Sequence, residues 1–311
     1  ECVNNAVAGG YQAIIVAANG PDAISSALKE AASTGVKIVY VDSPANVEAE
    51  ATFSTDNEAA GKTAGDEMIK ALEAAGITSG KIGIVNVNAA TDSTVKREAG
   101  FRSAFEGKGY ELMETQYGEG DAAKSQTIAE NYITQGVVGI FGCNEGSTTG
   151  TGNAIKASGN TGIIGVGFDK SDAIMNLIND GYLLCTMAQN PDQMGKLGVQ
   201  ACIKALNGED LGGEVTDTGV SVLTKEALAA ELGISESTIK KYENGERALS
   251  ITNLFKIIDY FKVDANTILN VAESKKETSI DSRLELMDCS KKAYFQKIFN
   301  EMLDNAEMLV S

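Results

Sequence analysis

The residues best suited to ligand chemistry follow directly after short apolar runs of the chain. Four segments mix carboxylate, amide and hydroxyl groups in this way: Asp42-Ser43, Asn88–Thr94, Cys143–Ser147 and Asp169–Asp172. Carboxylates and amides donate and accept hydrogen bonds in pairs, which is the chemistry that recognises vicinal hydroxyl groups. The competing interpretation is structural, because an Asp or Asn after a strand commonly forms a turn or caps the next helix.

The composition excludes several kinds of catalytic and metal site. The chain of 311 residues contains no histidine, which excludes Ser-His-Asp and Cys-His catalysis and the usual His-ligated metal sites. Five cysteines contain no Cys-x-x-Cys pair, so we expect lone buried thiols rather than a zinc site or a disulfide framework. They are Cys2, Cys143, Cys185, Cys202 and Cys289. We therefore expect a protein that is not an enzyme and that uses no metal and no cofactor.

Two glycine-containing motifs match nucleotide-binding sequences only in part. Gly61-Lys62-Thr63 looks like the end of a phosphate-binding loop, but the glycine required five positions earlier is Asp56 here. Asp56 and Asn57 are better explained as the cap of a helix that follows them. Gly165-Val166-Gly167 follows an apolar run but lacks the third glycine of a dinucleotide site. Neither motif predicts nucleotide binding.

The first part of the chain alternates strand-like and helix-like segments. Apolar, β-branched runs predict strands over 13–16, 37–41, 81–87, 137–141 and 163–168. Amphipathic patterns predict helices over 21–33, 57–75, 93–105, 122–135 and 192–206. Short strands that are apolar on both sides and separated by helices predict an α/β fold with parallel sheets. Ligands in such sheets bind outside the carboxyl ends of the strands, where the polar segments above lie.

A second part, from about residue 222, has a different composition. Residues 222–311 carry 12 Lys and Arg against 15 Asp and Glu, whereas the first 221 carry 14 against 28. Helical patterns follow over 225–232, 235–244, 250–261 and 265–270, then a polar tether from 273 and an amphipathic helix over 291–309. The net charge of −17 argues against a uniformly basic surface for nucleic acid or membrane. No apolar run is long enough for a membrane span, and no signal peptide is visible in a chain that opens at Glu1.

Several motifs of the first part resemble the type 1 periplasmic sugar-binding proteins, the ribose-binding group in particular. They are Tyr11–Val16, Thr55-Asp56-Asn57 with Gly61, Arg97 ahead of Gly100-Phe101, Val166-Gly167-Phe168-Asp169, Leu183–Gln193 and Thr218–Lys225. The resemblance covers roughly residues 1–225. It implies two α/β lobes that a hinge closes over one small sugar, as in the solute receptor of an ABC-type transporter. The first lobe would span about 1–78 and 190–215, and the second about 79–189, within a domain ending at 222.

The resemblance also implies which residues contact the sugar. Carried over position by position, they are Asp42, Asp92, Arg97, Asn144, Asp169 and Gln189. Two features depart from the family. Ser43 replaces the arginine that follows the first acid in ribose binders, which weakens the case for ribose itself. The chain also begins inside what the family has as its first helix, so we expect an N-terminally truncated first lobe that exposes strand edges and has marginal stability.

The second part resembles the Xre/Cro-type helix-turn-helix modules. The motifs are Leu223–Ala229, Leu232–Ile239 and Tyr242–Arg247. The resemblance implies an all-α DNA-binding domain over 223–272, with the helix from Ser235 to Tyr242 in the major groove of duplex DNA. Glu236, Ser237 and Lys241 would face base edges. Thr224, Lys225, Thr238, Asn244 and Arg247 would contact phosphates. Residues 273–311 would form the tether and a helix, and the apolar stripe of residues 291–309 could pair two copies into a homodimer.

Three hypotheses remain open at this point. In the first, the chain is a periplasmic or extracytoplasmic solute receptor that hands a sugar to the membrane subunits of a transporter and carries an appended helical module. In the second, it is a cytoplasmic, sugar-responsive transcriptional regulator, similar in logic to the Lac repressor family. In the third, two unrelated proteins are joined by accident, since both families read Leu/Val-Thr-Lys-Glu at the join.

Overall fold

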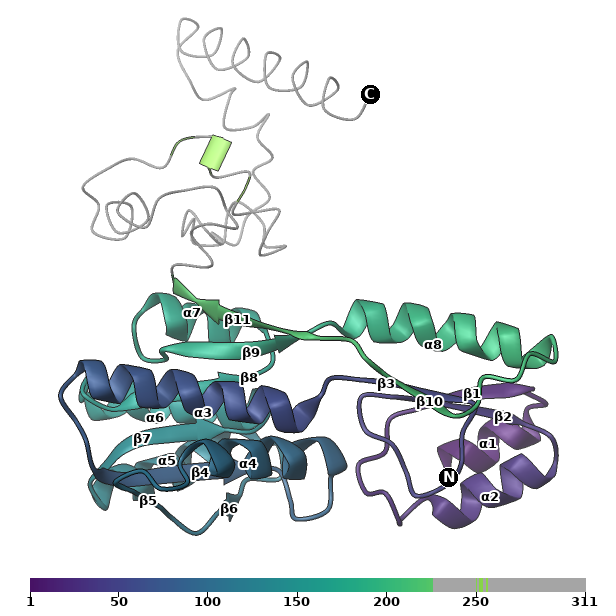
Figure 1. Ribbon diagram of the computed structural model, residues 1–311, viewed down its shortest axis with the longest axis horizontal. Coiled ribbons are helices and arrows are strands. Elements are labelled where there is room, and N and C mark those ends of the chain that lie inside the picture. The colour runs from purple at the N-terminus through teal and green to yellow at the C-terminus, as the bar shows by residue number, and fades with distance from the viewer. Residues whose placement is uncertain (226–249, 251, 254–255, 257–311) are drawn as a thin grey trace, which may run out of the picture. The chain divides into compact units, whose positions relative to one another are not determined.

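The computed structural model describes residues 1–225, 250, 252–253 and 256, and the chain divides into two compact units, Glu1–Asn253 and Leu254–Ser311. The first unit is an α/β structure with two separate sheets (Figure 1). The expected fold class of this part, two lobes built on parallel sheets, is confirmed. The expected tether and the helix over residues 291–309 lie outside the described residues.

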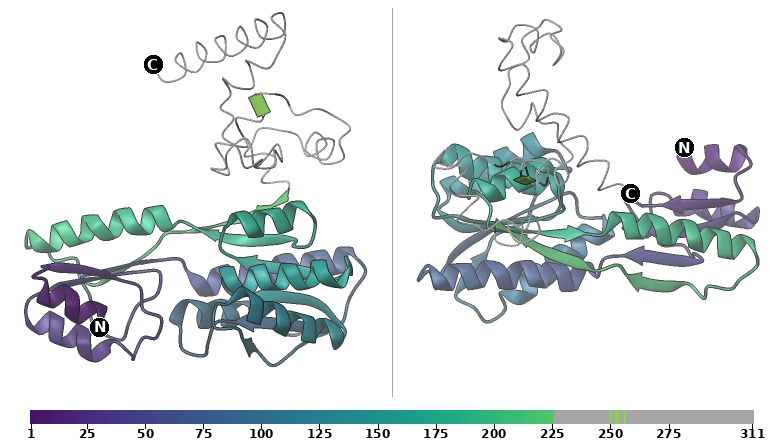
Figure 2. Two further views of the ribbon diagram at one scale, coloured as in Figure 1. Left: turned by 180° about the vertical axis from the view of Figure 1, so that it is seen from behind. Right: turned by 90° about the horizontal axis from the view of Figure 1, so that it is seen from above.

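The first sheet has four parallel strands in the order β1-β2-β3-β10. They are β1 (Ala13–Val16), β2 (Lys37–Val41), β3 (Ala51–Ser54) and β10 (Glu214–Asp217). Helix α8 (Pro191–Leu206) packs on β1, β2 and β3, while α2 (Ser25–Ser33) packs on β2 and contacts α1 (Cys2–Ala8). Figures 1 and 2 show α8 on one face of the sheet and α1 and α2 on the other. Strand β1 pairs with a described strand on one side only, and Ile15 on it is 40% exposed.

The second sheet has seven strands and holds the larger core. Its order is β11-β9-β8-β7-β4-β5, with β6 also pairing β4, and only β11 runs antiparallel to its neighbour. The strands are β4 (Gly80–Asn86), β5 (Tyr110–Leu112), β6 (Gln116–Tyr117), β7 (Val137–Gly142), β8 (Ile164–Phe168), β9 (Cys185–Gln189) and β11 (Val220–Thr224). The side chains of Ile84, Phe141, Val166 and Phe168 are fully buried, which accounts for the continuous apolar runs in the sequence.

Five helices cover this second sheet. They are α3 (Asn57–Ala74), α4 (Asp92–Ala104), α5 (Ala122–Thr134), α6 (Glu145–Ser158) and α7 (Asp172–Asn179). Helices α3 and α4 pack together on one side, and α5 and α6 pack together on the other (Figure 2). The sequence-based division assigned residues up to 78 to the first lobe. Helix α3 instead packs on α4, β8 and β9, because its buried residues Ala64, Met68 and Leu72 join the core of the second sheet.

The Gly61-Lys62-Thr63 triplet lies inside α3 and has a packing role. The Asp56 carboxylate accepts a hydrogen bond from the Ala59 amide at 3.0 Å and caps the helix, as expected. A Cβ atom on Gly61 would lie 2.0 Å from the Arg97 carbonyl oxygen. The glycine therefore allows α3 and α4 to approach closely.

Three chain segments connect the two lobes. They are the crossings from β3 to α3, from β9 to α8 and from β10 to β11. Hydrogen bonds tie the crossings together, since the Thr55 hydroxyl donates to Gln189 Oε1 at 3.0 Å and Asn190 Nδ2 donates to the Thr218 carbonyl at 2.8 Å. The Asp56 amide also donates to Asp217 Oδ1 at 2.9 Å. We call these three connecting segments together the hinge.

Candidate functional site

A single buried arginine lies at the centre of the candidate site. Arg97 is on α4 and is 2% exposed. Its Nε donates to Asn57 Oδ1 at 2.8 Å, and its Nη1 donates to the Cys143 carbonyl oxygen at 3.1 Å. The guanidinium carbon lies 3.9 Å from the centroid of the Phe168 ring, in cation–π geometry. The remaining nitrogen, Nη2, is buried and has no hydrogen-bond partner, so this site presents an unused donor.

Two carboxylates flank the guanidinium, one from each lobe. Asp42 follows β2 and places Oδ1 3.6 Å from Nη2, and Asp169 follows β8 and places Oδ2 4.0 Å from Nη1. Both backbones have positive φ angles, 58° at Asp42 and 72° at Asp169, which is uncommon for residues other than glycine. Burial lowers the pKa of Arg97, and the charges of Asp169 and Asp42 oppose that shift. An arginine remains charged in proteins, so the site combines one buried cation with two partly exposed anions.

Gln189 connects the hinge to this cluster. Its Nε2 donates to Asp169 Oδ1 at 2.6 Å, while its Oε1 accepts from the Thr55 hydroxyl. The second oxygen of Asp169 accepts from the Glu145 amide at 2.9 Å, at the start of α6. The Asp169 carboxylate is thus oriented by hydrogen bonds from two elements, β9 and α6.

Asn144 is the N-cap of α6, the structural role that the sequence left open. Its Oδ1 accepts from the Ser147 amide at 3.0 Å. Its Nδ2 makes no hydrogen bond to any residue that the structure describes, and this nitrogen is the atom nearest to a Cβ built on Gly120, at 3.4 Å. The cap uses the acceptor of the amide and leaves the donor available.

Asp92 and Ser43 have other partners. Asp92 is in the first turn of α4, where its carboxylate pairs with Lys96 at 2.8 Å. It makes no hydrogen bond or ion pair with Arg97, so the structure does not bring it into the cluster of Asp42, Arg97, Asp169 and Gln189. Ser43 donates to Asp42 Oδ2 at 3.1 Å and shares a 2.7 Å hydrogen bond with Ser93.

A polar cleft opens beside the cluster. It has a volume of about 640 Å³ and is lined at the strand ends by Asp42, Asp169 and Gln189, and by Glu145, Lys170 and residues 190–194. Its size falls in the range of small-molecule sites.

The sequence analysis did not identify Asn57 as a hydrogen-bond partner of Arg97. The Thr55-Asp56-Asn57 motif was its only signal, because nothing in the spacing shows that α3 meets α4 at this point.

The described residues form no metal centre, and two of their buried thiols are unsuited to nucleophilic chemistry. Among residues 1–225 and the few described beyond them, no group of three or more His, Cys, Asp or Glu side chains could hold a metal ion. Burial raises the pKa of the Cys143 thiol well above its ordinary value and that of Cys185 to about 12. These thiols are therefore protonated at neutral pH and are poor nucleophiles. Cys2, Cys143, Cys185 and Cys202 are free; the last three are buried, as expected, but Cys2 is exposed, and Cys289 lies outside the described residues.

Two of the eight expected DNA contacts are described, and both belong to the second lobe. Thr224 is the last residue of β11 and pairs with Cys185 in the sheet. Lys225 donates from Nζ to the Asn179 carbonyl at 2.7 Å, at the end of α7. The remaining expected contacts lie outside the described residues: Glu236, Ser237, Thr238, Lys241, Asn244 and Arg247. No helix in the described part is long and apolar enough to cross a membrane.

Comparisons with known proteins divide the chain at the same place as its composition. Residues 1–210 match the family described as a periplasmic binding protein domain, and residues 223–268 match the family described as a helix-turn-helix. The ribose import binding protein RbsB of Escherichia coli is 28% identical over 203 residues, which cover 64% of this chain and 67% of that protein. The D-ribose/D-allose-binding protein of Pseudomonas aeruginosa is 24% identical over 235 residues, 71% of this chain and 72% of that one.

Solved structures show the same similarity. An ABC transporter solute-binding protein of Agrobacterium vitis with bound D-fucose has a TM-score of 0.68 and 32% identity, covering 73% of this chain and 79% of that one. A carbohydrate transporter solute-binding protein of Agrobacterium radiobacter in complex with D-arabinose has a TM-score of 0.70 and 28% identity, covering 76% and 82%. These relatives are binding proteins and not enzymes.

Proposed function

The chain belongs to the periplasmic binding protein family, and we propose that residues 1–225 bind one small monosaccharide in the cleft between Asp42 and Asp169. A single observation carries the proposal. Arg97 is buried between two carboxylates and keeps Nη2 without a partner. A buried donor of this kind is unfavourable until an acceptor satisfies it. A sugar hydroxyl is such an acceptor, and the same hydroxyl can donate its proton to Asp42 or Asp169.

We assign the hydrogen bonds by the groups that remain available. Arg97 Nη2 donates to the sugar, Asp42 and Asp169 accept from it, and Asn144 Nδ2 donates from the start of α6. Gln189 holds Asp169 in place at 2.6 Å and links the site to the hinge. Asp92 has no part in this assignment because it pairs with Lys96. Since Asp42 comes from one lobe and Asp169 from the other, a sugar that bonds both favours a closed hinge.

The names of the relatives support a role in transport. RbsB is a ribose import binding protein, and the Agrobacterium proteins belong to sugar transporters. We therefore propose that this lobe pair serves as the solute receptor of an ABC-type carbohydrate transporter and delivers its sugar to the membrane subunits. Because Ser43 and Ser93 share a hydrogen bond where ribose binders have an arginine, we expect ribose to be a weaker ligand than another pentose or a deoxyhexose.

The helix-turn-helix match supports a second candidate function. Residues 223–268 resemble a DNA-binding domain, and in this alternative the sugar regulates DNA binding by the whole chain. The two candidates differ in one measurement, which is the DNA affinity of the full chain with and without its sugar. A change in affinity supports the regulator, whereas sugar binding with no effect on DNA binding supports the receptor alone.

Isothermal titration calorimetry of the full chain tests the sugar-binding proposal. D-ribose, D-allose, D-arabinose and D-fucose form the panel, and we expect saturable 1:1 binding of at least one of them. Asp169→Asn should weaken that binding about 10- to 150-fold, because a charged hydrogen bond contributes about 1.5–3 kcal/mol. Asp92→Asn is the matched control and should retain affinity. Binding that is lost equally in both variants, or no binding of any sugar in the panel, contradicts the proposal.

A further inference from the structure

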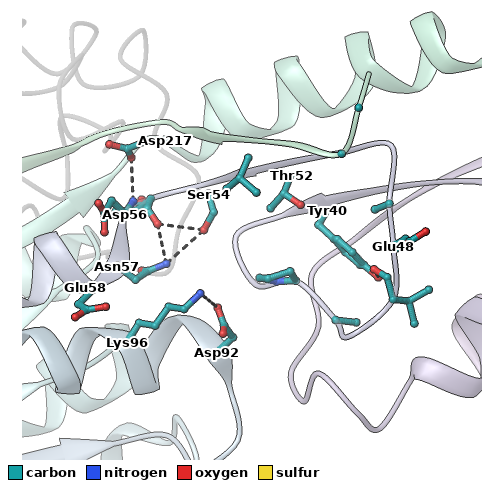
Figure 3. Close-up of a pocket in the computed structure, with 18 residues that line it drawn as sticks. Tyr40, Glu48, Thr52, Ser54, Asp56, Asn57, Glu58, Asp92, Lys96 and Asp217 are labelled. Carbon is teal, nitrogen blue, oxygen red and sulfur yellow. Dashed lines mark hydrogen bonds and ion pairs between the residues drawn. The ribbon is translucent and has the colours of Figure 1, made fainter. Parts of the chain in front are cut away.

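We propose that a second pocket, distinct from the sugar cleft, binds an aliphatic di- or triamine. The pocket has a volume of about 930 Å³ and lies between the first sheet and the beginnings of α3 and α4 (Figure 3). We call it the acidic pocket. It is lined by Tyr40 and Thr52 of the first sheet, Glu48 of the loop before β3, residues 56–58, Asp92 with Lys96, and by Gly212, Gly213, Val215 and Asp217. It shares no lining residue with the sugar cleft.

Negative charge dominates the rim of the acidic pocket. Five carboxylates line it, and the single cationic side chain, Lys96, is paired with one of them at 2.8 Å. The five are Glu48, Asp56, Glu58, Asp92 and Asp217. Asp56 and Asp217 accept hydrogen bonds from backbone amides, which orient the carboxylates without neutralising them. Glu48 and Glu58 have no hydrogen bond or ion pair with any described residue. The pocket therefore attracts cations.

An unpaired hydroxyl of a largely buried residue faces the pocket. Thr52 is 8% exposed, and its hydroxyl has no hydrogen-bond partner among the residues that the structure describes. Figure 3 shows the Thr52 side chain directed into the pocket, beside Tyr40. The hydroxyl oxygen is not among the fully buried, unpaired side-chain atoms, so it is accessible from the pocket. A hydroxyl oxygen in this position can accept the N–H of a bound ammonium group.

The wall behind this hydroxyl is apolar. The Tyr40 ring is 2% exposed, and its own hydroxyl already donates to the Val47 carbonyl at 3.0 Å. Pro44, Ala45 and Ala49 complete this side of the pocket. An apolar wall with carboxylates around the opening fits a ligand whose cationic nitrogens are separated by methylene groups, because both parts then find their preferred surroundings.

A metal ion fits these residues less well. No three carboxylates of the described chain converge closely enough to hold a metal ion, and the pocket is much wider than a cation coordination sphere. Divalent cations require several oxygen ligands at about 2.0–2.6 Å. Carboxylates spread around a wide opening match several separate positive charges instead.

An amine in this pocket would also influence the hinge. Tyr40 and Thr52 belong to the first lobe, whereas Asp92 and Lys96 are on α4 of the second. A ligand that contacts both lobes favours one angle between them. If the sugar favours a particular angle as well, each ligand changes the affinity of the other by the same factor.

Calorimetry of the full chain with spermidine and with 1,4-diaminobutane tests the proposal. We expect saturable 1:1 binding that weakens as salt is raised, since the carboxylates are exposed. Thr52→Val replaces the hydroxyl by a methyl group of the same shape and should weaken binding about fivefold. The double substitution Glu48→Gln, Glu58→Gln should weaken it by a similar factor of about five.

Glu106→Gln is the matched control, because Glu106 is exposed and follows the far end of α4. It removes one negative charge away from the pocket and should leave amine affinity unchanged. Circular dichroism of each variant establishes that the fold is retained. Equal weakening by Glu106→Gln, unaffected binding in Thr52→Val, or saturable Mg²⁺ binding in place of the amines would overturn the proposal. Sugar titrations of the same variants separate this result from a failure of the sugar site, since neither Thr52 nor Glu48 lines the sugar cleft.

Discussion

Arg97→Met is the substitution that tests most directly how the site is held together. The guanidinium makes hydrogen bonds to Asn57 and Cys143, lies between the Asp42 and Asp169 carboxylates and stacks on Phe168. Methionine has a similar length and can fill much of the same volume, but it cannot donate a hydrogen bond. The substitution therefore removes the charge and its bonds while limiting the cavity that remains.

The expected loss of stability follows from these contacts. Two hydrogen bonds from a charged donor contribute about 1.5–3 kcal/mol each, and their loss also leaves Asn57 Oδ1 and the Cys143 carbonyl without that partner. The ion pairs add less, because the Asp42 side chain is 40% exposed and that of Asp169 is 24% exposed. Methionine avoids the desolvation of a charge and removes the unpartnered Nη2. We therefore expect the free energy of unfolding to fall by about 2–3 kcal/mol in net terms.

Urea unfolding followed by far-ultraviolet circular dichroism measures this change, because the chain contains no tryptophan for fluorescence. Lys96→Met is the matched control. It removes the neighbouring cation of the same helix, whose pair with Asp92 is exposed and contributes below about 1 kcal/mol. If Arg97→Met and Lys96→Met differ in unfolding free energy by less than about 0.5 kcal/mol, the reasoning about the buried guanidinium is wrong.

Three further predictions concern packing, pH and thiol exposure. Gly61→Ala should destabilise the chain by more than about 2 kcal/mol, because the new Cβ would lie 2.0 Å from a carbonyl oxygen of α4. Gly195→Ala is the matched control, because its Cβ would meet nothing within 4 Å; it should stabilise α8 by about 0.5–1 kcal/mol in the same urea assay. Burial alone would raise the pKa of Glu98, but hydrogen bonds from three side chains lower it below 4.5. The ionised Glu98 carboxylate should therefore stabilise the fold above pH ~4.5, and this contribution should be lost as the pH falls through its lower, folded-state pKa. Acid unfolding curves of Glu98→Gln should lack this loss of stability. A thiol reagent should modify exposed Cys2 at once and buried Cys143 only after unfolding, so rapid labelling of Cys143 would contradict the structure.

Strand β10 and helix α3 are two elements that the sequence did not predict correctly. The strand-like runs over 13–16 and 37–41 correspond exactly to β1 and β2. In contrast, β10 was not expected, because its four residues are largely exposed and have no apolar pattern. The position of α3 was also assigned to the wrong lobe. Its apolar face was visible in the sequence, but which sheet this face would cover depends on packing across the hinge.

Composition and local patterns alone determined the α/β class, the change of character near residue 222 and the absence of histidine chemistry. These properties depend on residue type and on short-range spacing, which a linear chain displays directly. The same patterns pointed to Asp42 and Asp169 as polar residues after strands, whereas Arg97 and Gln189 were expected only from the resemblance to sugar-binding proteins. Only the tertiary structure decided that these four meet, that Asp92 pairs elsewhere and that Asn144 caps a helix. The physical reason is that the chain crosses between the lobes three times, so the distances within the site depend on how two separately packed sheets are held together.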